Sequence, residues 1–174
     1  MHRWIVVFVI VALGSRAALA QDPRGNSKLP EIVHIDGAKN PELIPQWSAW
    51  GYTFRVIAGG PRELPSLVYK VVSRDEAAMV LKEADAVQKI DKACEARIWK
   101  LHPLVGKEKP DVLDARLREI TVECRLETLH ARDRILRALN PEGAAALIMF
   151  VESTKSGTSI SLPKAELARF LEPE

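Results

Sequence analysis

The feature that most constrains the fold is a run of apolar residues in steps of three and four, which extends over residues 73–139 and is interrupted by one short proline-containing stretch. Residues at these steps share one face of an α-helix with about 3.6 residues per turn. Ser73 and Glu76 form a capping-box pattern, which predicts where the first helix begins. The sequence therefore predicts a long antiparallel hairpin of two helices, over about 73–102 and 111–139.

The two cysteines of the chain lie on the inward face of this hairpin. Cys94 and Cys124 are equally far from Lys109, and residues equally far from the turn of an antiparallel hairpin face each other. We expect a Cys94–Cys124 disulfide, which would close a loop of about 30 residues and stabilise the fold by about 3–4 kcal/mol on the chain-entropy model. Two alternatives are buried free thiols and a redox pair, and the lack of Cys-x-x-Cys spacing disfavours the second.

Residues 1–20 have the three parts of a secretory signal peptide: a basic start, an apolar run from Trp4 to Leu13, and small residues at Ala18 and Ala20. The run is shorter than the roughly 20 residues that span a bilayer. We expect cleavage after Ala20 and export to the periplasm or the extracellular space. An uncleaved membrane anchor is the alternative, because Arg16 is unusual so close to a cleavage site.

Composition divides the remaining chain into two parts. Residues 21–39 are rich in Pro, Gly, Asn and charge, and predict a flexible leader with one short extended segment at 31–35. Residues 40–174 predict a single helical domain of the all-α class, with five or six helices and little or no sheet. Without residues 1–20 the acidic and basic residues balance, so no charge block predicts nucleic acid or an anionic membrane as a partner, and no transmembrane span is expected.

An aromatic-rich helix is expected over about 41–58, packed on the long hairpin. Trp47, Trp50 and Phe54 lie on its apolar stripe. Core packing is the simpler interpretation of this stripe, and a binding face for a ligand or partner is the alternative.

The segments on either side of the hairpin give mixed signals. Residues 64–72 fit either a short helix after Pro65 or an extended connection. After the hairpin, Pro141 lies at the start of a helix that is apolar almost all round and is expected to be well buried. A short terminal helix is expected to begin at Pro163.

No catalytic template is met: the chain lacks Gly-x-Ser-x-Gly, a phosphate-binding glycine loop and His-Glu-x-x-His. His34, His102 and His130 do not have metal-ligand spacing. The charged residues of the hairpin alternate in sign, which is typical of the solvated face of long helices. We therefore expect no cofactor and no metal site, and an enzymatic role is the less favoured one.

Two segments carry a resemblance to known proteins. IDGAKNPELIPQWSAW (residues 35–50) and ALNPEGAAAL (residues 138–147) resemble uncharacterised exported bacterial proteins with an IDG-x-K-x-PE-x-IP segment and a late L-x-PEGAA helix. The run LNPEG (residues 139–143) is more loosely similar to the L-T-P-E-Q helix start of periplasmic LTxxQ-type stress and metal-resistance proteins, with its threonine and glutamine replaced. The first resemblance implies export and a helical body, and the second implies a long-helix hairpin.

Three functions fit these observations. The first is an exported, non-enzymatic helical protein that binds a protein partner, in the manner of an interaction or chaperone-like module. The second is a small-ligand carrier or enzyme with a site at the face formed by Trp47, Trp50 and Phe54. The third is a metal-responsive sensor, which would need at least three ligand groups that converge in space.

Overall fold

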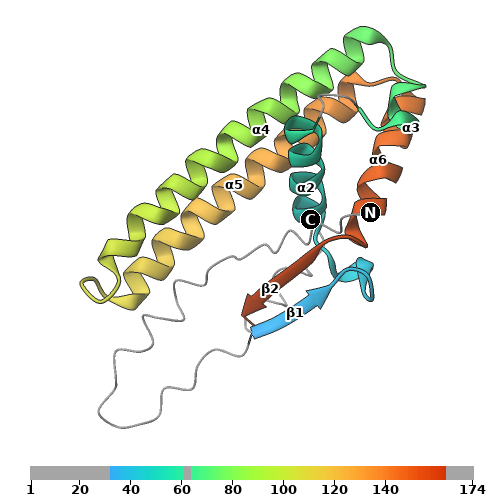
Figure 1. Cartoon of the computed structure of the whole chain (residues 1–174). Coiled ribbons are helices and arrows are strands. Elements are labelled where there is room, and N and C mark those ends of the chain that lie inside the picture. The colour runs from blue at the N-terminus through green and yellow to red at the C-terminus, as the bar shows by residue number, and fades with distance from the viewer. Residues whose placement is uncertain (1–31, 61–63, 164–174) are drawn as a thin grey trace.

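The computed structural model describes residues 32–60 and 64–163. Helices α4 (Arg74–Leu101) and α5 (Pro110–Ala138) lie side by side and antiparallel over their whole length (Figure 1). The 3-10 helix η2 (His102–Leu104) follows α4 directly, and Gly106 has a φ of 80° that glycine adopts without strain. The predicted hairpin and the all-α class are confirmed. The predicted signal peptide and terminal helix lie outside the described residues, except for Pro163.

The first helix of the hairpin begins as its sequence predicts. The Ser73 hydroxyl accepts a hydrogen bond from the Glu76 amide at 3.2 Å, and the Glu76 carboxylate accepts one from the Ser73 amide at 2.7 Å. Both amides belong to the first turn, where helical partners are missing. The capping box therefore fixes where α4 begins.

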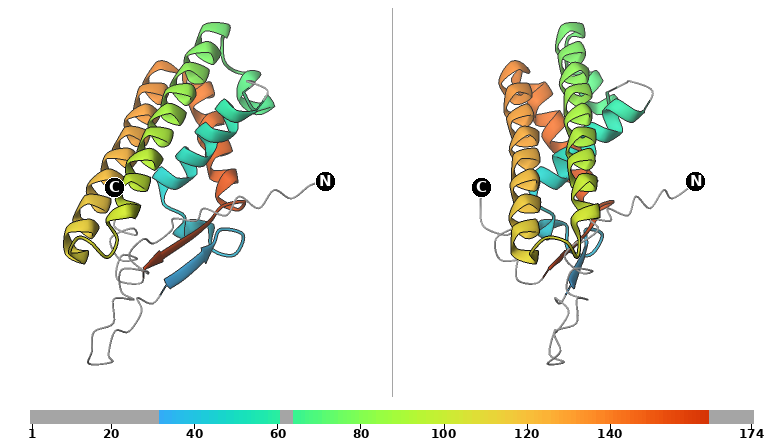
Figure 2. Two further views of the ribbon diagram at one scale, coloured as in Figure 1. Left: turned by 60° about the vertical axis from the view of Figure 1, so that its left-hand side comes forward. Right: turned by 90° about the vertical axis from the view of Figure 1, so that its left-hand side faces the viewer.

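Helix α2 (Gln46–Gly59) packs on both helices of the hairpin near its open end, and α6 (Pro141–Lys155) packs against α2 (Figures 1 and 2). Two short helices complete this body, η1 (Pro41–Leu43) and α3 (Ser66–Tyr69). The ambiguous segment 64–72 thus contains one helical turn. The side chains with the deepest burial come from all the longer helices and include Phe54, Ile57, Val80, Val87, Ile135, Leu147 and Val151.

Strand β1 (Ile32–Asp36) pairs antiparallel with strand β2 (Ser159–Pro163), and Ile35 lies opposite Ile160. Both of these isoleucines are buried against the helical core. The extended segment expected within the leader is therefore part of the folded body. Pro163 is the last residue of β2, and the residues expected to form a terminal helix after it lie outside the described part of the chain.

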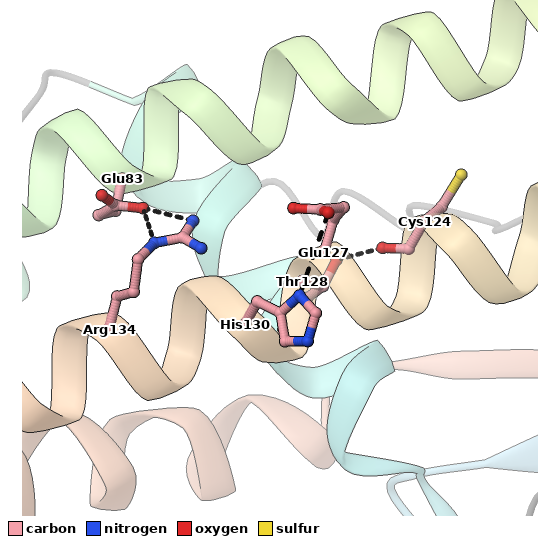
Figure 3. A network of polar contacts seen from close by, with 6 residues as sticks. All are labelled: Glu83, Cys124, Glu127, Thr128, His130 and Arg134. Atoms are coloured by element: carbon pink, nitrogen blue, oxygen red, sulfur yellow. Dashed lines mark hydrogen bonds and ion pairs between the residues drawn. The ribbon is translucent and has the colours of Figure 1, made fainter.

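The hairpin beyond α2 has a small core of its own. Cys94 and Cys124 are joined by a disulfide, as the symmetry of the hairpin predicted, and their Cα atoms are 6.5 Å apart. Cys94 packs with Leu101 and Ile120 in a cluster separate from the main core. Nearer the body, the Arg134 guanidinium donates to Glu83 at 2.8 Å across the hairpin (Figure 3).

Candidate functional site

The three aromatic residues expected to form a binding face have three different environments. Phe54 is fully buried, and Trp50 is 3% exposed with its ring centroid 5.6 Å from that of Phe54. Trp47 is half-buried, and the Arg125 guanidinium lies over its ring at 4.5 Å from the centroid. Phe54 therefore belongs to the core, and Trp47 ties the start of α2 to α5 through a cation–π contact.

A groove opens where α2, α5 and α6 meet, with a volume of about 380 Å³. Its apolar lining comes from Trp50 of α2, Leu136 of α5, and Ile148 and Val151 of α6. Trp50 is thus the one residue of the expected aromatic face that lines the groove. Volumes of about 300–1,000 Å³ are usual for ligand pockets.

Polar side chains of α2 and α6 form one edge of this groove. The Gln46 side-chain amide donates to Glu152 at 2.9 Å, and Lys155 forms an ion pair with the same carboxylate at 2.8 Å. Burial raises the pKa of Glu152, but the hydrogen bonds from Lys155 and Gln46 outweigh it, so that the pKa lies below its usual value. This carboxylate is therefore held in its charged form.

The edge on α5 carries a second close ion pair. The Arg132 guanidinium donates to Asp133 at 2.8 Å, and this hydrogen bond lowers the pKa of Asp133. The groove thus has a lining that is about half apolar and half polar, and its charged groups already have partners. Such a lining can contact a ligand or a protein segment that carries both apolar and polar groups.

Helices α5 and α6 also carry exposed apolar side chains, of which only Ile148 lines the groove. Ile148 is 43% exposed and Met149 is 64% exposed, which contradicts the expectation that their helix is well buried. Val122 and Leu126 are also exposed on α5. An apolar pattern that runs all round a helix does not indicate which side meets solvent, so the sequence held no signal for this surface.

The three histidines of the described residues lie on different elements, His34 on β1, His102 at the end of α4 and His130 on α5. The Nδ1 atom of His34 is 2.7 Å from the Ser161 hydroxyl across the strand pair, and the His102 ring lies 5.8 Å from that of Trp99. His130 lies 4.0 Å from Glu127 one turn before it on α5 (Figure 3). Within residues 32–60 and 64–163, no three His, Cys, Asp or Glu side chains are grouped to hold a metal ion.

Within the described residues, no helix is both long enough and apolar enough to cross a membrane. Comparison with protein-family models, with curated proteins and with solved structures finds no match for this chain.

Proposed function

We propose that this chain is an exported, non-enzymatic helical protein that binds a segment of another protein in the groove between α5 and α6. The observation that supports this function is the set of four apolar side chains that line the groove, of which Ile148 is exposed on α6. An amphipathic helix laid into a hydrophobic groove is a recurrent mode of protein recognition. The rim charges on Glu152 and Asp133 would orient such a segment.

Export has separate support. Residues 1–20 have the pattern of a signal peptide, and the Cys94–Cys124 disulfide is of the kind that persists in oxidising compartments. The resemblance of residues 35–50 and 138–147 to exported bacterial proteins agrees with this part of the proposal.

Site-specific photo-crosslinking tests the groove directly. A photoreactive phenylalanine analogue is placed at position 148 in the groove or, as a control, at position 82 on the exposed face of α4, and the protein is irradiated in the cells that produce it. We expect a discrete protein adduct from position 148 and none from position 82. Equal labelling from both positions, or none from either, would count against the groove.

A pair of neighbouring charge substitutions then measures affinity for the protein found in that adduct. Ile148→Glu and Met149→Glu place the same charge on the same helix, but only Ile148 lines the groove. We expect the first to weaken binding by about tenfold or more, since it places an unpaired charge in the interface, and the second to change it by less than about twofold. Comparable losses for both variants would contradict the proposal.

Trp50 supports a second candidate, in which the groove holds a small apolar ligand. Trp50 lines a space of about 380 Å³, within the usual range for such ligands. Native mass spectrometry of the protein purified from its own cells would detect the ligand as a defined added mass. Ile148→Glu is expected to remove that mass, and an unliganded native protein would argue against a carrier.

A further inference from the structure

The tip of the hairpin, defined here as residues 99–112, projects away from the other helices (Figures 1 and 2). Helix α2 crosses the hairpin where Arg55 binds Asp91 at 2.9 Å and where Trp47 lies under Arg125. Leu101 ends α4 ten residues beyond Asp91, which corresponds to about 15 Å of helix at 1.5 Å per residue. The tip therefore reaches well beyond the body of the protein.

The tip carries a large exposed aromatic ring. Trp99 is 66% exposed, and its ring makes a tilted contact with His102 at 5.8 Å between centroids. Val112 is exposed on the other side of the turn. Tryptophan combines a large apolar ring with one polar N–H group, and is therefore favoured where an apolar phase meets water.

The tip also carries three exposed lysines, Lys100 next to Trp99 in the chain, and Lys107 and Lys109 in the turn. Among the described residues none of them forms an ion pair. The acidic residues of the tip are Glu108 and Asp111, and Arg116 pairs with Glu108 at 3.0 Å. Residues 99–112 therefore carry a formal net charge of +1 with His102 neutral, and Arg116, just beyond them, neutralises Glu108.

We propose that the tip binds the surface of an anionic lipid bilayer. The Trp99 ring would enter the interfacial layer, while the ammonium groups of the lysines would lie among the lipid phosphates. Lysine acts as a flexible, hydrated point charge and suits a field of phosphates, whereas a defined protein carboxylate is more often met by the planar fork of arginine. This surface is separate from the groove, and the proposal does not depend on the groove having a partner.

Co-sedimentation of the disulfide-bonded protein with sucrose-loaded vesicles tests this. The vesicles contain either phosphatidylcholine alone or phosphatidylcholine with phosphatidylglycerol. We expect binding to the anionic vesicles only, weakened by salt because surface charges are screened over about 8–10 Å near physiological ionic strength. Brominated lipids are expected to quench the fluorescence of the wild type more strongly than that of Trp99→Ala.

Two triple variants with equal loss of charge locate the contact. Lys100→Gln, Lys107→Gln and Lys109→Gln together are expected to lower the partition coefficient by about 100-fold, at about fivefold per lysine. The control carries Lys82→Gln, Lys89→Gln and Lys92→Gln on the exposed face of α4, and should bind within about threefold of the wild type because these charges lie beyond the screening length.

The same measurements can overturn the proposal. Equal losses in the two triple variants would mean that overall charge, and not the tip, governs binding. If the wild-type protein does not sediment with an excess of anionic vesicles, the tip does not bind a lipid surface. A protein would then be the remaining candidate partner of the tip. The circular dichroism spectrum and the intact mass without reductant are measured for every variant. If both match the wild type, misfolding is excluded as the cause of a loss of vesicle binding.

Discussion

At the scale of single residues, Glu76 links the starts of two helices. Its carboxylate accepts hydrogen bonds from the Ser73 amide at 2.7 Å and from the Asn140 amide at 2.6 Å. These backbone donors, Ser73 first, lower the pKa of Glu76 from 4.5 to about 2. Asn140 in turn caps α6 by accepting from the Gly143 amide at 2.8 Å. One carboxylate therefore caps α4 and holds the start of α6 beside it.

This pairing predicts a loss of stability in acid. The folded-state pKa of Glu76 lies below its ordinary value of 4.5, so the carboxylate stabilises the fold above that pH, and the contribution disappears as the pH falls from about 4.5 to about 2. Glu76→Gln should melt at a lower temperature than the wild type at pH 7, and the difference should shrink through that window. Glu95→Gln on the exposed side of α4 is the control, and a difference that stays constant from pH 7 to pH 2 would contradict the prediction.

Replacement of glycine by alanine is expected to have opposite effects on the free energy of unfolding at two positions. A Cβ atom on Gly37 would overlap the carbonyl oxygen of Lys155 and lie 2.6 Å from that of Thr158, so Gly37→Ala should lower the free energy of unfolding by about 1–3 kcal/mol. A Cβ atom on Gly51, inside α2, would have its nearest contact at 3.9 Å from the Thr128 methyl group. Gly51→Ala should raise that free energy by about 0.5–1 kcal/mol. Urea denaturation measures both, and changes of the same sign would be inconsistent with this packing.

At the scale of the elements, the disulfide acts on the part of the hairpin that has the fewest other contacts. The cluster of buried residues around it holds Cys94, Leu101 and Ile120, whereas the main core draws on all the longer helices. A small apolar cluster supplies little stabilisation of its own. The cross-link should therefore matter most to the far half of α4 and α5.

Replacing both cysteines by alanine is expected to lower the free energy of unfolding by about 3–4 kcal/mol, because the disulfide closes a loop with a sequence separation of 30. Loss of the disulfide should increase the rate of hydrogen–deuterium exchange over that of the wild type, and the increase should be larger in residues 94–124 than in α2. Acceleration that is uniform over the two regions would mean that the disulfide stabilises the whole body equally.

The elements also show what sequence patterns can and cannot predict. The hairpin and its cysteine pair followed from periodicity and symmetry, which are local properties. Strand β2 did not, because its partner is far away in the chain and Pro163 fits a helix start as well as a strand end. The groove on α6 escaped prediction because it depends on how three helices meet. For the aromatic stripe the sequence left core packing and a binding face open, and Phe54 is fully buried in the core.

At the scale of the whole molecule, the strand pair joins segments from opposite ends of the described chain. Ile160 is 3% exposed and packs into the main core together with Ile35. Ile160→Ala is expected to lower the free energy of unfolding by about 2–4 kcal/mol through the cavity that it leaves. Met149→Ala removes a similar volume from the surface and should change it by less than about 0.5 kcal/mol. Similar values for the two variants in chemical denaturation would show that the strand pair is not part of the cooperative core.

The strand pair also sets an order of events during folding. The long hairpin closes through contacts that are near in sequence, whereas His34 of β1 meets Ser161 of β2 across 127 positions. Local contacts form fast and distant ones slowly, so β1 should be the last element to find its partner. Until then its backbone amides and carbonyls form an open edge, which makes β1 the place where an interrupted folding reaction would begin to aggregate.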